Sequence, residues 1–349
     1  MGEVANLTSA SGIPNAFRRS PGSPMSTADA SGPARPRLLS TSVGTNLEAF
    51  GPREWGLLAL IATVWGSSFL FMEIGLRAFA PGLVTTFRVG LGALALAMVP
   101  SARRTRIDRD DLPRVALLGV SWMGIPLLLF PVAQQWIDSS VAGMVNGAMP
   151  LTVAAWSAVL LRRLPGRTQA IGLVIGAVGV VAVSLPELPV GRLAESGTAR
   201  TALGTGLVFL AIVLYGLSAN LAVPLQQRYG ALPVLFRAQL FALVVIVPFG
   251  IAALPGSRFA WGPALAMVPL GVLGTGVAFV LMATLVGRVG GPRGSIAIYF
   301  VPVVAIVLGV LALGESVHPL AVAGTLLVLV GAWVTSRREP TRSAPSEAV

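Results

Sequence analysis

Apolar and polar positions alternate along this chain in long blocks, without the short periods typical of a soluble domain. Charged or turn-forming stretches separate ten apolar segments. The segments lie near residues 55–74, 83–99, 115–132, 142–161, 169–185, 203–223, 234–254, 264–286, 295–313 and 319–335. A bilayer core is crossed by about 17 to 25 helical residues, and in lipid only a helix satisfies every backbone polar group within one segment. The pattern therefore predicts ten transmembrane helices.

The order of residues in the first half of the chain recurs in the second half. Trp65-Gly66-Ser67-Ser68, followed by Phe87-Arg88, reappears roughly 150 residues later as Tyr215-Gly216-Leu217-Ser218, followed by Phe236-Arg237. The match extends along each half, for example from Leu118-Gly119-Val120 to Leu270-Gly271-Val272. An internal duplication of this length is typical of secondary transporters. Each copy holds five segments, an odd number, so the second copy must enter the bilayer inverted.

We therefore expect an all-α membrane protein whose ten transmembrane helices form two inverted five-helix repeats. The first residues are rich in Ser, Pro, Ala and Gly and show no apolar period, which indicates disorder. The predicted parts are a disordered cytoplasmic tail at residues 1–52, a first repeat at 53–186, an external linker loop at 187–202, a second repeat at 203–336 and a cytoplasmic tail at 337–349.

Proline and glycine mark where the helices bend or pack closely. Each proline within a helix removes a backbone donor and favours a kink. Those within or at the ends of apolar segments are Pro126, Pro131, Pro150, Pro224, Pro248, Pro269 and Pro302. The pairs Gly143 with Gly147 and Gly172 with Gly176 have the small-xxx-small spacing that lets helices touch, and we interpret them as packing positions.

Arginine is distributed unequally between the two sides that this topology defines. With both termini inside, the cytoplasmic segments hold 19 Arg residues and the opposite side holds 4, while Arg88 and Arg237 lie inside helices. Cytoplasmic loops of membrane proteins carry an excess of basic residues. We therefore expect a multi-pass protein of the cell membrane, the inner membrane of a bacterium, with both termini in the cytoplasm.

Composition agrees with a membrane protein and excludes several other classes. Apolar residues make up 54% of the chain and charged residues 11%, against about a quarter charged in soluble proteins. The net charge of +11 comes from Arg between apolar runs, without interleaved stacking aromatics, so we expect no nucleic acid partner. The chain has no Cys, a single His318 and no catalytic or phosphate-loop motif, so we expect no metal, no cofactor and no enzymatic activity.

Polar and aromatic residues at membrane depth are the candidates for a binding site. Ser and Thr at such depth often bond to their own helix, whereas burial of Arg, Asn or Gln is costly and points to a cavity. The candidate substrate-binding residues are Trp65, Ser68, Arg88, Gln134, Asn146, Tyr215, Asn220, Arg237, Gln239 and Tyr299. Trp65 and Tyr215 are related by the repeat, and we expect them to flank a central cavity as a pseudo-symmetric pair.

Glu73 and Arg88 are candidates for a gate. Their positions are equally distant from the turn at Ala80-Pro81, which places them at similar depth in a helical hairpin. We therefore expect an ion pair that helps to close the outer side. The alternative is that Arg88 extends to the lipid headgroups.

The Trp65-Gly66-Ser67-Ser68 motif, the Phe87-Arg88 pair, the helices at Pro150 and Pro302 and the Gly-rich last helix of each half resemble the EamA domain of the drug/metabolite transporter superfamily. The resemblance covers both halves, roughly residues 55–336. It implies ten helices, a central cavity and export of amino acids or other small metabolites by alternating access.

Three functions follow as hypotheses. The first is a secondary transporter that exports a small organic metabolite, an amino acid or a related compound, through the lipid bilayer. The second is efflux of lipophilic cations or drugs, for which Glu73 is the candidate membrane carboxylate. The third, a membrane enzyme or sensor, lacks a nucleophile, a metal set or a sensing domain. The sequence leaves open the substrate, a coupling proton or ion, and a monomer or a dimer.

Overall fold

The computed structural model describes residues 38–137, 142, 145–184, 198–304, 307 and 319–337. Every regular element within these ranges is helical, and none of their residues forms a β-strand. The α-helices are α1 (Pro52–Leu76), α2 (Pro81–Ala97), α3 (Pro100–Arg104), α4 (Leu112–Gly119), α5 (Ile125–Ala133), α7 (Met149–Leu161), α8 (Arg167–Ser184), α10 (Thr198–Tyr229), α11 (Ala231–Ala252), α12 (Trp261–Gly271), α13 (Ala278–Val289), α14 (Gly291–Gly294) and α16 (Pro319–Ser336). Short 3-10 helices are η1 (Arg109–Asp111), η4 (Leu254–Gly256) and η6 (Ser295–Tyr299), and two π-helices are η2 (Val120–Gly124) and η5 (Val272–Val277).

Several of these elements join into stretches long enough to cross a membrane. Within the described residues five such stretches are apolar enough to do so: Pro52–Leu76, Arg109–Ala133, Arg200–Tyr229, Ala231–Ala252 and Trp261–Val289. Four shorter apolar helices are Pro81–Ala97, Met149–Leu161, Arg167–Ala182 and Val322–Ser336. The prediction of an all-helical membrane protein is confirmed for the described part of the chain. The ninth predicted segment, 295–313, the centre of the linker loop and His318 lie wholly or partly outside it.

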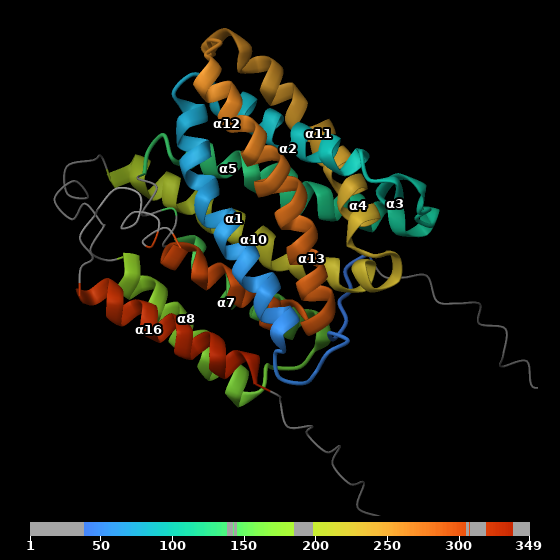
Figure 1. Ribbon diagram of the computed structural model, residues 1–349, viewed down its shortest axis with the longest axis vertical. Coiled ribbons are helices and arrows are strands. Elements are labelled where there is room, and N and C mark those ends of the chain that lie inside the picture. Colours follow the sequence, from blue (N-terminus) through green and yellow to red (C-terminus); the bar gives the residue numbers. More distant parts are fainter. Residues whose placement is uncertain are drawn as a thin grey trace, which may run out of the picture. The chain divides into compact units, whose positions relative to one another are not determined.

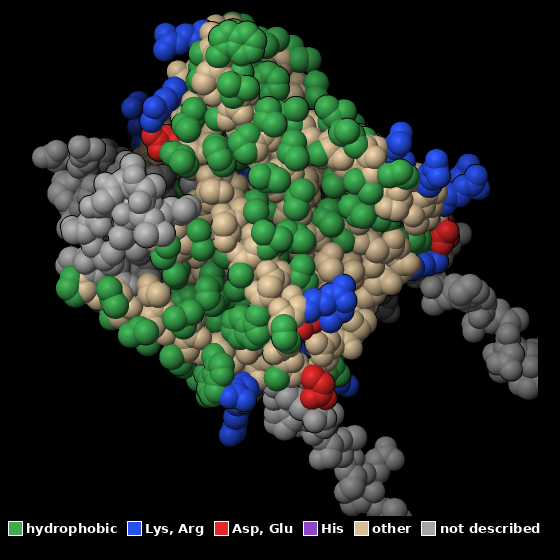
Figure 2. Space-filling model, in the orientation of Figure 1, with side chains coloured by type: hydrophobic (Ala, Val, Ile, Leu, Met, Phe, Trp, Pro, Cys, Tyr) green, Lys and Arg blue, Asp and Glu red, His purple; other side chains and the backbone are tan. Residues whose placement is uncertain are grey.

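Apolar side chains cover the lipid-facing surface of the helices. Leu60 of α1, Leu265 of α12 and Leu273 of η5 are all exposed. Figure 2 shows apolar side chains over the middle of this face and arginines towards its edges. This distribution suits helices surrounded by hydrocarbon, with basic residues at the headgroups.

Helices of the two halves pack against each other more than within their own half. Helix α1 packs mainly against α12 and α13, and α2 packs mainly against α11 and η5 (Figure 1). In the repeat-related arrangement α10 packs against α5 and α7, and α11 packs against α4 and η2. Helices α8 and α16, the last of each half, lie side by side (Figure 1). The duplicated units therefore build one interleaved bundle, with few contacts between α1 and α2.

The two π-helices stand at corresponding positions of the repeat. Each follows a glycine of the matched Leu-Gly-Val motif, Gly119 before η2 and Gly271 before η5. A Cβ on Gly119 would lie 2.1 Å from the Ala238 carbonyl oxygen of α11, and one on Gly271 would lie 2.6 Å from Cβ of Leu91 of α2. Both glycines allow close helix approach. The widened turns that follow leave backbone carbonyls without their usual helical partner, a feature frequent at functional sites.

Internal prolines free further carbonyls, and polar side chains from other segments bond to them. Pro131 in α5 has no N–H, so the Leu127 carbonyl accepts a hydrogen bond of 3.1 Å from the Thr85 hydroxyl of α2. Pro224 in α10 frees the Asn220 carbonyl in the same way, and the Thr41 hydroxyl donates to it at 2.9 Å. The kinks predicted from sequence are therefore also places where separate segments are joined.

Close packing explains the glycines of α8. A Cβ on Gly172 would lie 2.3 Å from the Thr335 hydroxyl oxygen of α16, and one on Gly176 would lie 2.3 Å from the ring of Tyr299. Gly172 and Gly176 thus act as the packing positions that their spacing indicates. Gly143 lies outside the described residues.

Residues 38–51, which we call the strap, were expected within a disordered tail, but the structure gives them defined contacts with one end of the bundle. The Ser40 hydroxyl accepts a hydrogen bond of 2.8 Å from Arg114 of α4, and the Val43 carbonyl accepts one of 2.9 Å from Gln227 of α10. Other bonds join the Asn46 N–H to the Arg288 carbonyl of α13, at 2.6 Å, and the Phe50 N–H to the Ser336 carbonyl of α16, at 3.2 Å. The strap contacts helices of both halves. The strap bonds largely through its backbone and small hydroxyls. Such contacts leave no apolar pattern in the sequence, so composition alone indicated disorder here.

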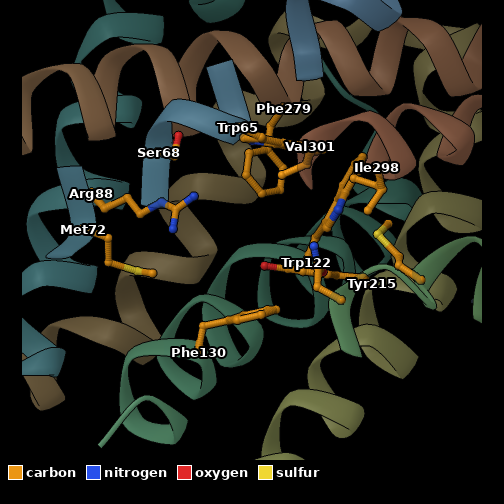
Figure 3. A pocket seen from close by; sticks show the side chains of 12 residues that line it. Trp65, Ser68, Met72, Arg88, Trp122, Phe130, Tyr215, Phe279, Ile298 and Val301 are labelled. Atoms are coloured by element: carbon orange, nitrogen blue, oxygen red, sulfur yellow. The ribbon is translucent and has the colours of Figure 1, made fainter. Parts of the chain in front are cut away.

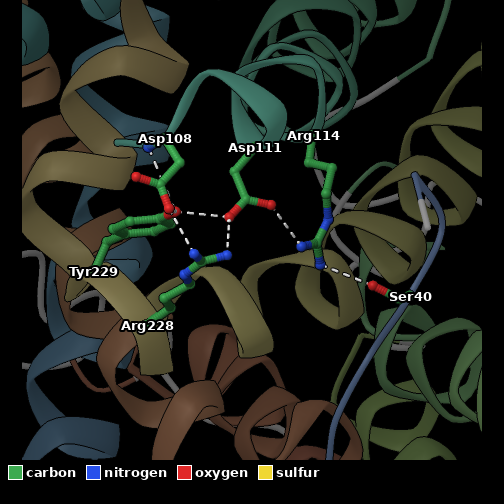
Figure 4. A network of polar contacts seen from close by, with 6 residues as sticks. All are labelled: Ser40, Asp108, Asp111, Arg114, Arg228 and Tyr229. Carbon is green, nitrogen blue, oxygen red and sulfur yellow. Dashed lines mark hydrogen bonds and ion pairs between the residues drawn. The ribbon is translucent and has the colours of Figure 1, made fainter. Parts of the chain in front are cut away.

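A buried carboxylate organises a polar network at the same end (Figure 4). Asp111 is fully buried and accepts hydrogen bonds from Arg114 at 2.9 Å, Arg228 at 2.8 Å and the Tyr229 hydroxyl at 2.7 Å. Arg228 also pairs with Asp108. The network connects the start of α4 with the end of α10 and, through Arg114 and Ser40, with the strap.

Candidate functional site

A pocket inside the bundle is lined by side chains from both halves. The residues that line it are Trp65, Ser68, Met72, Arg88, Trp122, Phe130, Asn146, Met149, Tyr215, Phe279, Ile298 and Val301. They come from α1, α2, η2, α5, α7, α10, α13, η6 and the residues that flank α7 and η6. Because the helices of the halves interleave, residues far apart in sequence meet around one space (Figure 3).

Five of the twelve described side chains around the pocket are aromatic: Trp65, Trp122, Phe130, Tyr215 and Phe279. Trp65 and Trp122 each contact Phe279 edge to face, with ring centroids 5.3 and 5.4 Å apart, and Phe130 stacks on Tyr215 at 5.9 Å. Such geometries hold the rings in fixed orientations. The repeat-related Trp65 and Tyr215 thus both face the pocket, as the sequence comparison of the two halves predicts.

Arg88 is the charged member among the described residues of the pocket lining. Its side chain is 9% exposed and extends from α2 into the pocket towards the aromatic rings (Figure 3). Its Nε donates a hydrogen bond of 2.8 Å to the Thr275 hydroxyl oxygen in η5. None of the ion pairs among the described residues includes Arg88. Nη1 and Nη2 have no hydrogen-bond or ion-pair partner among the described residues.

Other polar groups of the lining differ in how far they are satisfied. The Trp65 indole N–H donates to the Gly274 carbonyl of the π-helix η5, at 3.0 Å. The Ser68 hydroxyl donates to the Val64 carbonyl of its own helix, at 2.7 Å, which is the usual role of such a serine. The Asn146 side-chain oxygen is buried and has no hydrogen-bond partner. Asn146 therefore supplies an unused acceptor.

Five predicted site residues lie away from this pocket. Gln134 lines a separate hollow beside the turn between α1 and α2. The Asn220 amide donates to the Val153 and Gly216 carbonyls, both at 2.9 Å, and the Tyr299 hydroxyl donates to the Leu173 carbonyl of α8 at 2.7 Å. The Asn220 and Tyr299 side chains thus join helices to each other.

Arg237 and Gln239 of α11 also have structural partners. Arg237, the repeat counterpart of Arg88, donates to the Ala102 and Thr105 carbonyls at the end of α3, at 3.1 and 2.7 Å. Gln239 is fully buried behind η5, and its amide donates to the Thr275 carbonyl at 3.3 Å. The two arginines that the repeat relates thus occupy different environments.

The predicted ion pair between Glu73 and Arg88 is replaced by other contacts in the structure. Glu73 of α1 pairs at 3.1 Å with Arg77, the residue just after the end of α1, and their side chains are 66% and 67% exposed. Helices α1 and α2 share few contacts, because α12 and η5 pack against both. The expectation of a simple hairpin, on which the equal spacing from the turn depended, does not describe this arrangement.

Sequence reasoning missed most of the apolar wall. Met72, Met149, Ile298 and Val301 resemble any other lipid-facing or core residue in the sequence. Trp122 carried a weak signal, because it follows Ser121 in a predicted helix that is interrupted by Pro126. No group of His, Asp or Glu residues in the described part of the chain is arranged to hold a metal ion.

Apolar spanning helices, an internal duplication and a pocket between the duplicated halves define a multi-pass membrane protein with a central pocket. The model of the EamA-like transporter family matches the chain twice, at residues 54–185 and 202–337. The chain belongs to the EamA-like transporter family, as its resemblance in sequence indicated. This membership points to a transporter rather than an enzyme.

Curated relatives over most of the chain are also transporters by name. An uncharacterized transporter of Archaeoglobus fulgidus is 25% identical over 82% of this chain and 99% of its own length. A probable terminal-alkyne amino-acid exporter of Streptantibioticus cattleyicolor is 27% identical over 81% of this chain and 93% of its own length. A probable amino-acid metabolite efflux pump of Salmonella typhimurium is 23% identical over 81% and 94%.

A solved structure has the same fold. It covers 81% of this chain and 96% of its own chain, with a TM-score of 0.63 and 17% sequence identity. Similarity at this identity extends to the fold alone.

Proposed function

We propose that this protein is a secondary transporter that exports a small organic metabolite by alternating access. In this proposal residues 53–186 and 203–336 are inverted five-helix repeats, and the substrate binds between them in the pocket around Arg88. The observation that carries the proposal is the lining of one pocket by helices of both halves, with a buried Arg among fixed aromatic rings. Relatives named as an amino-acid exporter and an amino-acid metabolite efflux pump support export of a compound of that kind.

Efflux of lipophilic cations is the second candidate, supported by the aromatic and Met side chains of the pocket. Two features favour the first candidate. Glu73, the carboxylate that cation efflux would use, is exposed and paired with Arg77 outside the pocket. The described lining contains a buried Arg and no acidic residue, and a fixed positive charge repels a cation.

Overexpression in a bacterial host tests the proposed function directly. Metabolites in the culture medium are compared between cells that carry the full chain and cells that carry an empty vector. We expect a small set of organic metabolites to accumulate several-fold with the full chain. An unchanged medium at confirmed membrane expression would contradict export.

A pair of aromatic substitutions connects this export to the pocket. The double variant Trp65→Ala/Tyr215→Ala should abolish most of the accumulation, because it removes two walls of the site. Trp261→Ala, at an aromatic residue that is 74% exposed at the start of α12, is the control and should export normally. Normal export by the double variant at equal expression would place the substrate elsewhere.

A further inference from the structure

We propose that Arg88 binds a carboxylate, so that the compound carried in the pocket is an organic monoanion with an apolar body. The inference rests on the proposed function, because it assigns the substrate class of the same pocket. It identifies Arg88 as the residue that selects for charge and makes an amino group on the substrate secondary.

The first step is the state of the Arg88 side chain. A buried guanidinium without an opposite charge is costly, because the protein interior solvates it poorly. Thr275 satisfies Nε, and the described residues supply no carboxylate for Nη1 and Nη2. These two groups form the edge of the guanidinium that binds a carboxylate with two parallel hydrogen bonds. The Thr275 bond fixes the fork in its direction into the pocket.

The second step is the number of charges. Among the described residues of the lining, Arg88 is the basic one, and none is acidic or His. A carboxylate with one negative charge is neutralised there, whereas a dianion such as a phosphate monoester would retain an unpaired charge among apolar walls. The pocket therefore favours a monocarboxylate over a phosphate ester.

The third step is the remainder of the substrate. Trp65, Trp122, Phe130, Tyr215 and Phe279 present rings to the pocket, and such walls suit an apolar or aromatic body. The unpaired side-chain oxygen of Asn146 accepts a hydrogen bond from an N–H or O–H of the substrate. Asn146 itself carries no charge, so we expect this contact to contribute less to binding than the ion pair at Arg88.

Three probes with the same phenyl ring separate these contributions. 3-Phenylpropanoate has only the carboxylate, phenylalanine has the carboxylate and an ammonium group, and 2-phenylethylamine has only the ammonium group. Binding of each to the purified full-length protein in detergent is measured by titration calorimetry. We expect both carboxylates to bind within a few-fold of each other and the amine to bind at least roughly 10-fold more weakly, as expected for loss of a charged hydrogen-bonded contact.

Substitutions of Arg88 locate the selectivity. Arg88→Gln should weaken both carboxylates by roughly 10- to 100-fold and leave the amine unchanged or tighter. Arg88→Lys should keep part of the binding, because Lys retains the charge without the two-pronged geometry. Arg237→Gln is the matched control at the repeat-related Arg, whose partners are the Ala102 and Thr105 carbonyls, and it should bind all three probes as the unaltered protein does. Thermal midpoints of the variants show whether each is folded.

Several outcomes would overturn the proposal. Amine binding equal to or tighter than that of the carboxylates would do so, as would absence of carboxylate binding to the unaltered protein. Carboxylate binding by Arg88→Gln at full strength, or an equal loss in Arg237→Gln, would also contradict it. If the metabolite export described above persists in any of these cases, transport stands and only the substrate class is wrong. If export fails as well, the proposed function is wrong.

Discussion

At the scale of residues, the pair formed by Arg88 and Thr275 shows how one half of the chain positions a functional group of the other. Arg88 lies on α2, and Thr275 lies in the π-helix of the second half. The Thr275 hydroxyl accepts from Arg88 and itself donates to the Leu270 carbonyl at 3.3 Å, five residues earlier in the chain, the spacing of a π-turn. Thr275 is fully buried and does not line the pocket, so it acts through Arg88.

This arrangement makes Thr275 a positioning residue that can be tested. Thr275→Val keeps the shape but removes the hydroxyl, so we expect roughly 3- to 10-fold weaker binding of 3-phenylpropanoate, in line with loss of one hydrogen bond. Binding of 2-phenylethylamine should not change. Thr275→Ser restores the hydroxyl and should restore carboxylate binding. Equal weakening of both probes in Thr275→Val, measured by the same calorimetry, would indicate a general structural role.

Asp111 supports a second prediction at this scale. Its buried carboxylate accepts from Arg114, Arg228 and Tyr229, so Asp111→Asn leaves Arg114 without its charged partner and Arg228 with Asp108 alone. Breaking a buried ion pair costs about 3 to 5 kcal/mol. We expect a clear fall in the thermal midpoint of the purified protein. Asp110→Asn, at the exposed neighbouring carboxylate, should change the thermal midpoint by no more than about a degree, because surface substitutions cost little.

Single residues also show what the sequence could and could not predict. Pro131 and Pro224 reveal in the sequence that the carbonyls of Leu127 and Asn220 have lost their helical donors. The donors, Thr85 and Thr41, are known only from the packing, because nothing local relates them to these carbonyls. The same limit applies to the pocket. The sequence identified five residues that line it, Trp65, Ser68, Arg88, Asn146 and Tyr215. It could not distinguish them from residues that bond to other helices, such as Asn220, Gln239 and Tyr299. All are polar or aromatic groups at membrane depth.

At the scale of elements, close approach of α2 to the second half brings Arg88 to Thr275. Gly271, just before η5, permits this approach: a Cβ there would be 2.6 Å from Cβ of Leu91 and 3.0 Å from the Arg88 carbonyl oxygen. Period and composition predicted the helices themselves. They could not predict that α2 packs mainly against α11 and η5, because that choice depends on contacts between halves.

Alanine at Gly271 should therefore force α2 and η5 apart. We expect Gly271→Ala to lower the free energy of unfolding by about 1 to 3 kcal/mol, the usual cost of overpacking, and to weaken 3-phenylpropanoate binding. Gly262→Ala is the matched control on the same helix, since a Cβ there meets no atom within 4 Å. It should be neutral or slightly stabilising, because Ala favours helix over Gly. Equal stability of the two variants in thermal unfolding would show that the approach is not tight.

At the scale of the whole molecule, the duplication and the arginine distribution together predict how the chain crosses the membrane. The family model matches both halves, and the strap contacts the ends of α10, α13 and α16. The prediction from sequence is that this end faces the cytoplasm, because the predicted cytoplasmic segments hold 19 Arg residues and the other side holds 4.

Reporter fusions test this orientation. A phosphatase that is active only outside the cytoplasm should be silent when fused to the C-terminus and active when inserted after Arg192, in the predicted external loop. Arg192 lies outside the described residues, so the experiment supplies information that the structure does not. The reverse pattern of activity would invert the topology and place the strap on the outer side.

The bond between Thr41 and Asn220 has a consequence for the energetics of motion. Pro224 leaves the Asn220 carbonyl without a donor of its own helix, and the strap supplies one. Detachment of the strap leaves the Asn220 carbonyl without a hydrogen-bond donor again, which costs about 1 to 3 kcal/mol where no water replaces it. Any motion that separates α10 from the strap must therefore break this bond. The protein then has two forms, one with the strap bound to α10 and one with the strap released. For the proposed alternating access, we expect sequence changes in the strap to shift these populations, and with them the rate of transport, without touching the substrate.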